Sequence, residues 1–169
     1  MPEISSSQGL GDGATRLPAV IGILPWSWMG DGNNGNIIHA AAARRVIGRY
    51  VEYEKAGEWT KAQIDHLRSE NSHLVYVTAN LIRIGVPGGH PSIRDLVSSQ
   101  VALTKNIERA ALPVVVFGLG SQTGLNGPLE FSVAPETVRL LKVISDHSRK
   151  IAVRGEFTAD ACMRLELKI

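Results

Sequence analysis

The feature that most constrains the fold is an apolar run that ends at two glycines, Pro-Val-Val-Val-Phe-Gly-Leu-Gly-Ser-Gln at residues 113–122. Its four consecutive apolar residues, three of them β-branched, predict a strand buried on both faces, as in a parallel sheet. The two glycines then allow a sharp turn and the close approach of another group. Polar residues follow at the carboxyl end of this strand, which is the edge where open α/β sheets bind ligands. This stretch therefore predicts both a parallel sheet and the position of a site.

Apolar runs alternate with segments of helical pattern over most of the chain. Strands are predicted at residues 18–24, 74–78, 114–117 and 150–154, and helices at 37–49, 60–70, 92–111, 135–147 and from 158 to about 165. Asn36 and Thr158 are expected to cap two of these helices. The alternation predicts an α/β fold, a Rossmann-like parallel sheet flanked by helices, over residues 18–169. Residues 1–17, rich in Ser and Gly, are expected to form a disordered lead-in.

Composition argues against several functional classes. The 18 Lys and Arg against 16 Asp and Glu leave a formal charge of +2, and the cations are scattered, so no nucleic-acid interface is expected. The chain has one cysteine, which excludes an internal disulfide framework and fits a reducing compartment. No apolar run approaches the ~18 residues that span a bilayer. We therefore expect a cytoplasmic protein with no membrane span.

Polar residues follow the predicted strands at a single edge of the sheet. Right-handed crossovers place all strand-to-helix loops of a parallel sheet on the same side. The segments expected to meet there are residues 31–36, Asn80, residues 118–122 and residues 154–158. This convergence is the main argument from the sequence for a binding site.

Arg154 is the sharpest candidate in that edge. A guanidinium directly after a buried strand is costly unless an anion meets it, and Arg can donate two hydrogen bonds to one carboxylate or phosphate. A structural ion pair with Glu156 or another carboxylate explains the residue equally well. Both interpretations remain open from the sequence.

Other motifs are less specific. The glycine-rich loop at residues 30–37 has the glycine spacing of a phosphate-binding loop, but Asn36 and Ile37 replace its Lys and its Ser or Thr, which argues against nucleotide hydrolysis. Its amides could still present a helix N-terminus to an anion or a sugar, or form a plain turn. The five histidines have no metal-ligand spacing, so no metal is expected. Among them, His39 fits packing better than a place at the edge.

Three stretches, taken in order, resemble the polysaccharide pyruvyl transferase family. They are Asn-Asn-Gly-Asn at residues 33–36, Leu-Pro-Val-Val-Val-Phe-Gly-Leu-Gly-Ser-Gln at 112–122 and Ile-Ala-Val-Arg-Gly-Glu-Phe-Thr at 151–158. The resemblance covers about residues 19–169 and implies a transferase that moves the enolpyruvyl unit of phosphoenolpyruvate onto two hydroxyls of a sugar, forming a pyruvate ketal. It also implies two Rossmann-like lobes in the glycosyltransferase-B-like arrangement.

The resemblance further implies which residues bind the donor. Arg154 takes the position of the arginine that contacts phosphoenolpyruvate, and the cleft would be lined by Asn33, Asn34, Gly35, Asn36, Gly118, Gly120, Ser121 and Gln122. The general acid and base are not assigned. Phosphoenolpyruvate enters as donor substrate, with no separate cofactor, and a sugar or polysaccharide as acceptor.

The resemblance extends over an amino-terminal lobe alone, since no stretch matches the family's second lobe. A second lobe or a second copy of the chain is therefore an expected partner, and this single lobe is expected to turn over poorly. Two alternatives remain open: half of a nucleotide-sugar-dependent glycosyltransferase, and a non-catalytic α/β binding module.

Overall fold

The structure, a computed structural model, describes residues 16–22, 34–52, 57–85, 94–123 and 131–169. In chain order its elements are β1 (Leu17–Gly22), α1 (Asn34–Ile47), β2 (Val51–Glu52), α2 (Lys61–Glu70), β3 (Asn71–Val77), β4 (Asn80–Arg83), α3 (Arg94–Ala110), β5 (Val114–Phe117), β6 (Gly120–Gln122), α4 (Pro135–His147) and α5 (Glu156–Arg164). Most of the predicted lead-in, residues 1–15, lies outside the described residues, and β1 already begins at Leu17. Residues 23 and 24 of the first predicted strand also lie outside them.

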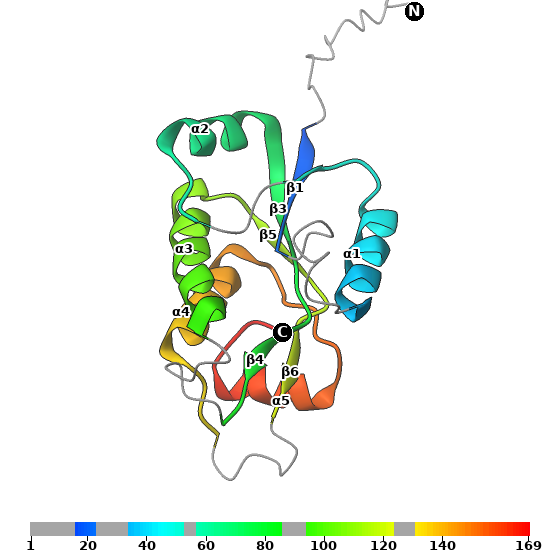
Figure 1. Cartoon of the computed structure of the whole chain (residues 1–169), viewed down its shortest axis with the longest axis vertical. Helices are drawn as coiled ribbons and strands as arrows, with labels where there is room; N and C mark the ends of the chain where they lie inside the picture. Colours follow the sequence, from blue (N-terminus) through cyan, green and yellow to red (C-terminus); the bar gives the residue numbers. More distant parts are fainter. Residues whose placement is uncertain (1–15, 23–33, 53–56, 86–93, 124–130) are drawn as a thin grey trace, which may run out of the picture.

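The main sheet confirms the predicted α/β class. Among the described residues it has four parallel strands in the order β2-β1-β3-β5. Figure 1 shows α1 on one face of this sheet and α2, α3 and α4 on the other. The chain therefore has the layered, Rossmann-like arrangement that the alternating pattern predicts.

The two faces of the sheet are covered unequally. On the side of α2, α3 and α4, alternate residues of β3 and β5 such as Tyr76 and Val116 join a large apolar core. On the side of α1, Ala43 packs with Val75 and Val77 in a smaller cluster. The predicted burial of the 114–117 strand on both faces is wrong: Val115 is 42% exposed. The reason is that β5 is an edge strand of the described sheet, where Phe117 and not Val115 packs against the cluster that includes Ala43 of α1.

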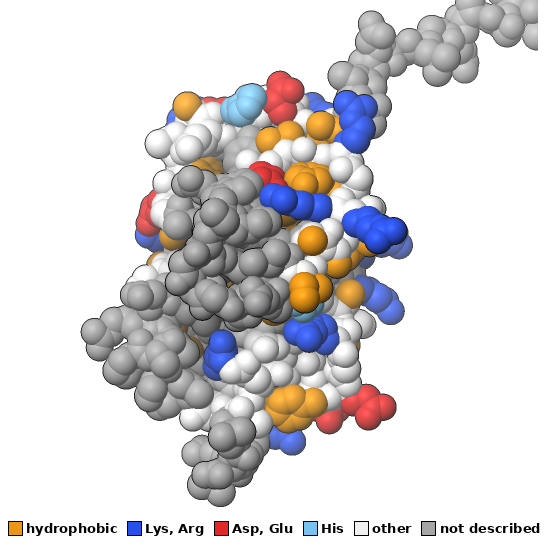
Figure 2. Space-filling view, turned by 45° about the vertical axis from the view of Figure 1, so that its right-hand side comes forward, with side chains coloured by type: hydrophobic (Ala, Val, Ile, Leu, Met, Phe, Trp, Pro, Cys, Tyr) orange, Lys and Arg blue, Asp and Glu red, His pale blue; other side chains and the backbone are white. Residues whose placement is uncertain are grey.

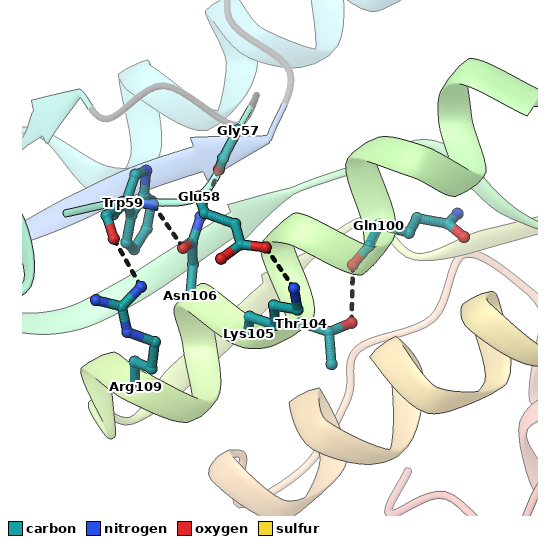
Figure 3. A network of polar contacts seen from close by, with 8 residues as sticks. All are labelled: Gly57, Glu58, Trp59, Gln100, Thr104, Lys105, Asn106 and Arg109. Carbon is teal, nitrogen blue, oxygen red and sulfur yellow. Dashed lines mark hydrogen bonds and ion pairs between the residues drawn. The ribbon is translucent and has the colours of Figure 1, made fainter.

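A polar clamp fixes the segment before α2 against α3, as Figure 3 shows. Asn106, fully buried, accepts a hydrogen bond from the Trp59 backbone N–H (2.9 Å) and donates to the Gly57 carbonyl (2.9 Å). Arg109 donates to the Trp59 carbonyl (2.7 Å). Lys105 pairs with Glu58 at the surface. This clamp satisfies backbone groups that would otherwise be buried without partners.

Strands β3 and β5 both bend at the same level and continue as β4 and β6, which form a second parallel pair. The bend occupies Thr78 and Ala79 in one strand and Gly118 and Leu119 in the other. The predicted strands end at residues 78 and 117, so the sequence does not predict β4, which buries Leu81 and Ile82, or β6. The small sheet packs against α5, below the main sheet in Figure 1.

The predicted strand at residues 150–154 does not form. Only an isolated bridge joins Val153 to Leu119, because the Ile151 N–H donates to the Lys168 carbonyl (2.8 Å) instead of a neighbouring strand. Two predicted helix caps are also wrong. Helix α1 begins at Asn34, so Asn36 lies in its first turn, and α5 begins at Glu156 with Gly155 as its N-cap.

No helix in the described ranges is long and apolar enough to cross a membrane. Figure 2 shows one face of the molecule, on which Lys and Arg side chains are spread from top to bottom with hydrophobic ones between them. The cations on this face are therefore dispersed, as the sequence suggests.

Candidate anion site at the bend of two strands

The site lies at the carboxyl ends of β3 and β5, next to the point between β1 and β3 where the strand order changes direction. From β1 the chain passes through α1 to β2 on one side, and then returns to β3 on the other side. Such a switch point leaves a crevice beyond the strand ends, and open α/β sheets bind their ligands there. The bend between β5 and β6 follows at the neighbouring strand.

Two glycines make the bend possible. Gly118 has φ +75°, and a Cβ there would lie 3.3 Å from the Thr78 carbonyl oxygen and 3.5 Å from Cε1 of His39. Gly120 donates its N–H to the Ala79 carbonyl (2.6 Å), and a Cβ there would lie 2.9 Å from that oxygen. A side chain at either position would collide with these neighbours or require a left-handed backbone that only Gly adopts freely. The predicted role of both glycines in close backbone approach is confirmed.

Arg154 reaches this bend from the segment before α5. Its backbone N–H donates to the Leu119 carbonyl (2.9 Å), which fixes the start of the side chain beside β6. Its Cδ lies 3.2 Å from the position of a Cβ on Gly120, and its Nη1 donates to Oδ1 of Asn80 at 3.4 Å. The side chain is exposed. The guanidinium is therefore placed at the glycine bend by its backbone and lies open to solvent.

The charge of Arg154 is not neutralised within the part of the chain that the structure describes. The ion pairs there join Arg44 to Glu52, Lys61 to Asp65, Lys105 to Glu58 and Arg139 to Glu108. Glu156, two residues after Arg154, makes no ion pair with it. The partner that Arg154 does have is the neutral amide of Asn80 at a long distance, so most of its five N–H donors remain available to a ligand. The interpretation of Arg154 as half of a structural ion pair gains no support from these contacts.

Ser121 has a structural role in this arrangement. Its backbone N–H donates to Oγ1 of Thr158 (3.0 Å), and the two hydroxyl oxygens lie 3.0 Å apart. Thr158 is 4% exposed and belongs to α5, so the pair ties α5 to β6. The hydroxyl of Thr158, predicted to cap the helix, is used in this tie instead.

The remaining predicted residues lie further from Arg154 or outside the description. Gln122 pairs with Arg83 at the end of β6 opposite to the Asn80–Gly120 pair. Asn33 lies outside the described residues. Asn34, Gly35 and Asn36 form the first turn of α1, and their side chains are not described. The structure thus brings together Arg154, Asn80 and the two glycines of the predicted set.

His39 is the member that the sequence interpretation assigned to packing. Helix α1 presents its ring to the bend, with Cε1 3.5 Å and Nδ1 3.7 Å from the position of a Cβ on Gly118. Burial, and secondly the positive charge of Arg154, lower the pKa of its imidazole below the ordinary value. The signal available in the sequence was its place in the first turns of the helix that follows β1, at the carboxyl edge of the sheet.

This set of groups suits a small anion. It combines one exposed guanidinium, one imidazole and a backbone bend with no side chain at Gly118 or Gly120, and Oδ1 of Asn80 holds the guanidinium beside the bend. Within the described ranges, no group of three or more His, Cys, Asp or Glu side chains could hold a metal ion. A wide hollow of about 710 Å³ lies away from this site, beside β2 and the end of α1, and its Arg44 is already paired with Glu52.

Comparisons of the chain with models of known protein families, with characterised proteins and with solved structures find no significant match. The observations that bear on function are therefore the geometry of the bend and the three sequence stretches.

Proposed function

We propose that the chain binds phosphoenolpyruvate at Arg154 and presents it for transfer of the pyruvyl group to two hydroxyls of a polysaccharide sugar. In this proposal it is the donor-binding lobe of a two-lobe, glycosyltransferase-B-like pyruvyltransferase. One observation carries the choice of site: the Arg154 guanidinium is exposed beside Gly120 and pairs with no carboxylate of the described residues. The resemblance of the three stretches supports the choice of ligand.

Phosphoenolpyruvate matches the groups at the bend. Its planar carboxylate and its tetrahedral phosphate each present two oxygens that a guanidinium fork binds with two parallel hydrogen bonds. Hydrogen bonds to a charged group contribute about 1.5–3 kcal/mol each. The two glycines let the backbone pass close to the Thr78 and Ala79 carbonyls, and the Arg154 side chain lies against this bend.

The proposed reaction needs charge stabilisation at the donor. Two acceptor oxygens form bonds to the enol carbon, the bond from that carbon to the phosphate oxygen breaks, and a proton adds to the methylene carbon. The hydroxyl protons leave as the ketal forms, and the departing phosphate carries the negative charge. A fixed cation beside the phosphate or the carboxylate lowers the cost of this redistribution. Arg154 supplies that cation, and the second lobe would supply the acceptor and the proton donor.

Thermal unfolding tests the proposal. A ligand that binds only the folded state at 100 times its Kd stabilises by about 2.7 kcal/mol. For a chain of this size, this corresponds to a rise in Tm of roughly 5–10 °C. We expect phosphoenolpyruvate to raise the Tm of the wild-type protein and of Lys142→Gln, an exposed α4 variant with the same loss of charge, but not of Arg154→Gln.

Two outcomes would overturn the proposal. One is a Tm that does not respond to phosphoenolpyruvate, or that responds equally in Arg154→Gln. The other is protection by a nucleotide-sugar and not by phosphoenolpyruvate, which would favour a glycosyltransferase half.

A further inference from the structure

His39 in α1 and Arg154, which lies just before α5, are far apart in sequence but border the same bend. The imidazole lies 3.5 Å from the position of a Cβ on Gly118, and the Cδ of Arg154 lies 3.2 Å from that of Gly120. These glycines are separated by one residue. The two side chains therefore flank the same short stretch of backbone, and the positive charge of Arg154 acts on the imidazole.

Within the described part of the chain, no negatively charged group acts on His39 to balance a protonated ring. The face of α1 that packs on the sheet meets Val75 and Val77 of β3 and Phe117 of β5, which are apolar. Arg154 is the charged group of the described residues that acts on His39, and it opposes protonation. Burial opposes protonation as well and is the larger cause. Both effects favour the neutral form of the imidazole.

We infer that His39 is the second anion-binding group of this site and that it takes up a proton when a doubly charged anion binds at Arg154. The inference rests on the proposed function, which places the ligand at Arg154. It adds that the ligand is a dianion and that its binding is coupled to the uptake of a proton. A dianion offsets the charge of Arg154 and leaves a negative charge for an imidazolium to bind. When the imidazole is neutral, Arg154 alone balances the charge of a monoanion. When His39 is protonated, the two side chains together balance the charge of a dianion such as a phosphate ester.

The sign of the pH dependence follows from this linkage. The pKa of His39 in the empty protein lies below its ordinary value, and the bound dianion raises it, since an opposite charge favours the protonated form. Between these two pKa values each binding event takes up a proton, so affinity increases as pH falls. The increase is at most about tenfold per pH unit for one proton.

Calorimetric titration with sulfate and with phosphoenolpyruvate between about pH 5 and 8 measures this linkage. Sulfate remains a dianion throughout, so any change of its affinity with pH belongs to the protein. Titrations in two buffers of different ionisation enthalpy give the number of protons taken up. We expect the wild type and His66→Gln, a variant of an exposed histidine on α2, to bind sulfate several-fold more tightly at the acid end with proton uptake. In His39→Gln we expect both the pH dependence and the proton uptake to be lost.

The NMR resonances of the histidine rings give a second measurement, which is made on the wild-type protein and uses His39→Gln only to assign the signal. We expect the resonance that is absent from His39→Gln to titrate below the ordinary pKa of an imidazole in the protein without ligand, and at higher pH with sulfate. An unchanged titration of His39 in a protein that does bind sulfate or phosphoenolpyruvate through Arg154 would overturn the inference and leave the proposed function standing. Binding that is unaffected by Arg154→Gln would contradict the proposed function, and with it the inference. Absence of binding to the wild type would overturn both.

Discussion

At the scale of single residues, the bend depends on Gly118 for two separate reasons. Its φ of +75° is unfavourable for any residue with a Cβ, and a Cβ would also lie 3.3 Å from the Thr78 oxygen and 3.5 Å from His39. Gly48, at the end of α1, has a similar φ of +74° but nothing within 4 Å of the Cβ position. Comparing substitutions at Gly118 and Gly48 therefore distinguishes the cost of the left-handed backbone from the cost of crowding.

Replacing each glycine by alanine is expected to give different results. Gly48→Ala should lower the free energy of unfolding by about 1–2 kcal/mol, the cost of a left-handed residue, and leave anion binding unchanged. Gly118→Ala should lose more stability than that and should weaken phosphoenolpyruvate binding, because the methyl group displaces His39 or the Thr78 carbonyl. Denaturant unfolding and calorimetry check both effects. Equal losses of stability with unchanged binding would show that the bend is not crowded.

The residues of the site were predictable to different degrees. Arg154 and the two glycines follow directly from an apolar strand, a glycine turn and a cation at the end of the next apolar run. The place of His39 in the site was not predictable, because the sequence does not show which way the ring of a histidine in the first turns of a helix points. The sequence also could not show that no acid of the described residues pairs with Arg154, because Glu156 is close to it in sequence.

At the scale of elements, the clamp between α3 and the segment before α2 makes a graded prediction. Asn106→Ala leaves the buried Trp59 N–H without its partner and should lower the free energy of unfolding by about 1–3 kcal/mol. Lys105→Ala, one residue away, removes only a surface ion pair with Glu58 and should have a far smaller effect. Urea unfolding of the two variants checks this order. A larger loss for Lys105→Ala would mean that the buried amide contributes little.

Some helices and strands are determined by the hydrophobic pattern of their own sequence, and others by contacts with neighbouring elements. The strand at 114–117 and the helix at 135–147 have strong local patterns, and both form where predicted. Strands β4 and β6 have no such pattern and exist because each continues a bent strand beside the other. The segment at 150–154 has the pattern of a strand, but the Lys168 carbonyl takes the Ile151 N–H that a ladder would need.

At the scale of the whole molecule, the unequal cover of the sheet can be measured at two neighbouring valines. Val116 is 3% exposed and faces the large core, whereas Val115 on the opposite face is 42% exposed. Val116→Ala should cost about 2 kcal/mol of stability, and Val115→Ala clearly less. Chemical denaturation provides the comparison. Equal costs would imply that β5 is covered on both faces, as the sequence alone suggested.

The layered fold as a whole was predictable because alternating strands and helices permit few arrangements. The edge at which ligands bind follows from the same rule. What the pattern did not contain is the shared bend of β3 and β5, which is a property of two strands side by side. That bend is what sets Arg154 against Gly120 and His39 against Gly118.

The most direct test of the account is a crystal structure of the protein with phosphoenolpyruvate bound. It should show a carboxylate or phosphate oxygen of the ligand within hydrogen-bond distance of the Arg154 guanidinium, over Gly118 and Gly120. A ligand bound elsewhere, or an Arg154 side chain turned away from the bend to pair with an acid, would contradict it.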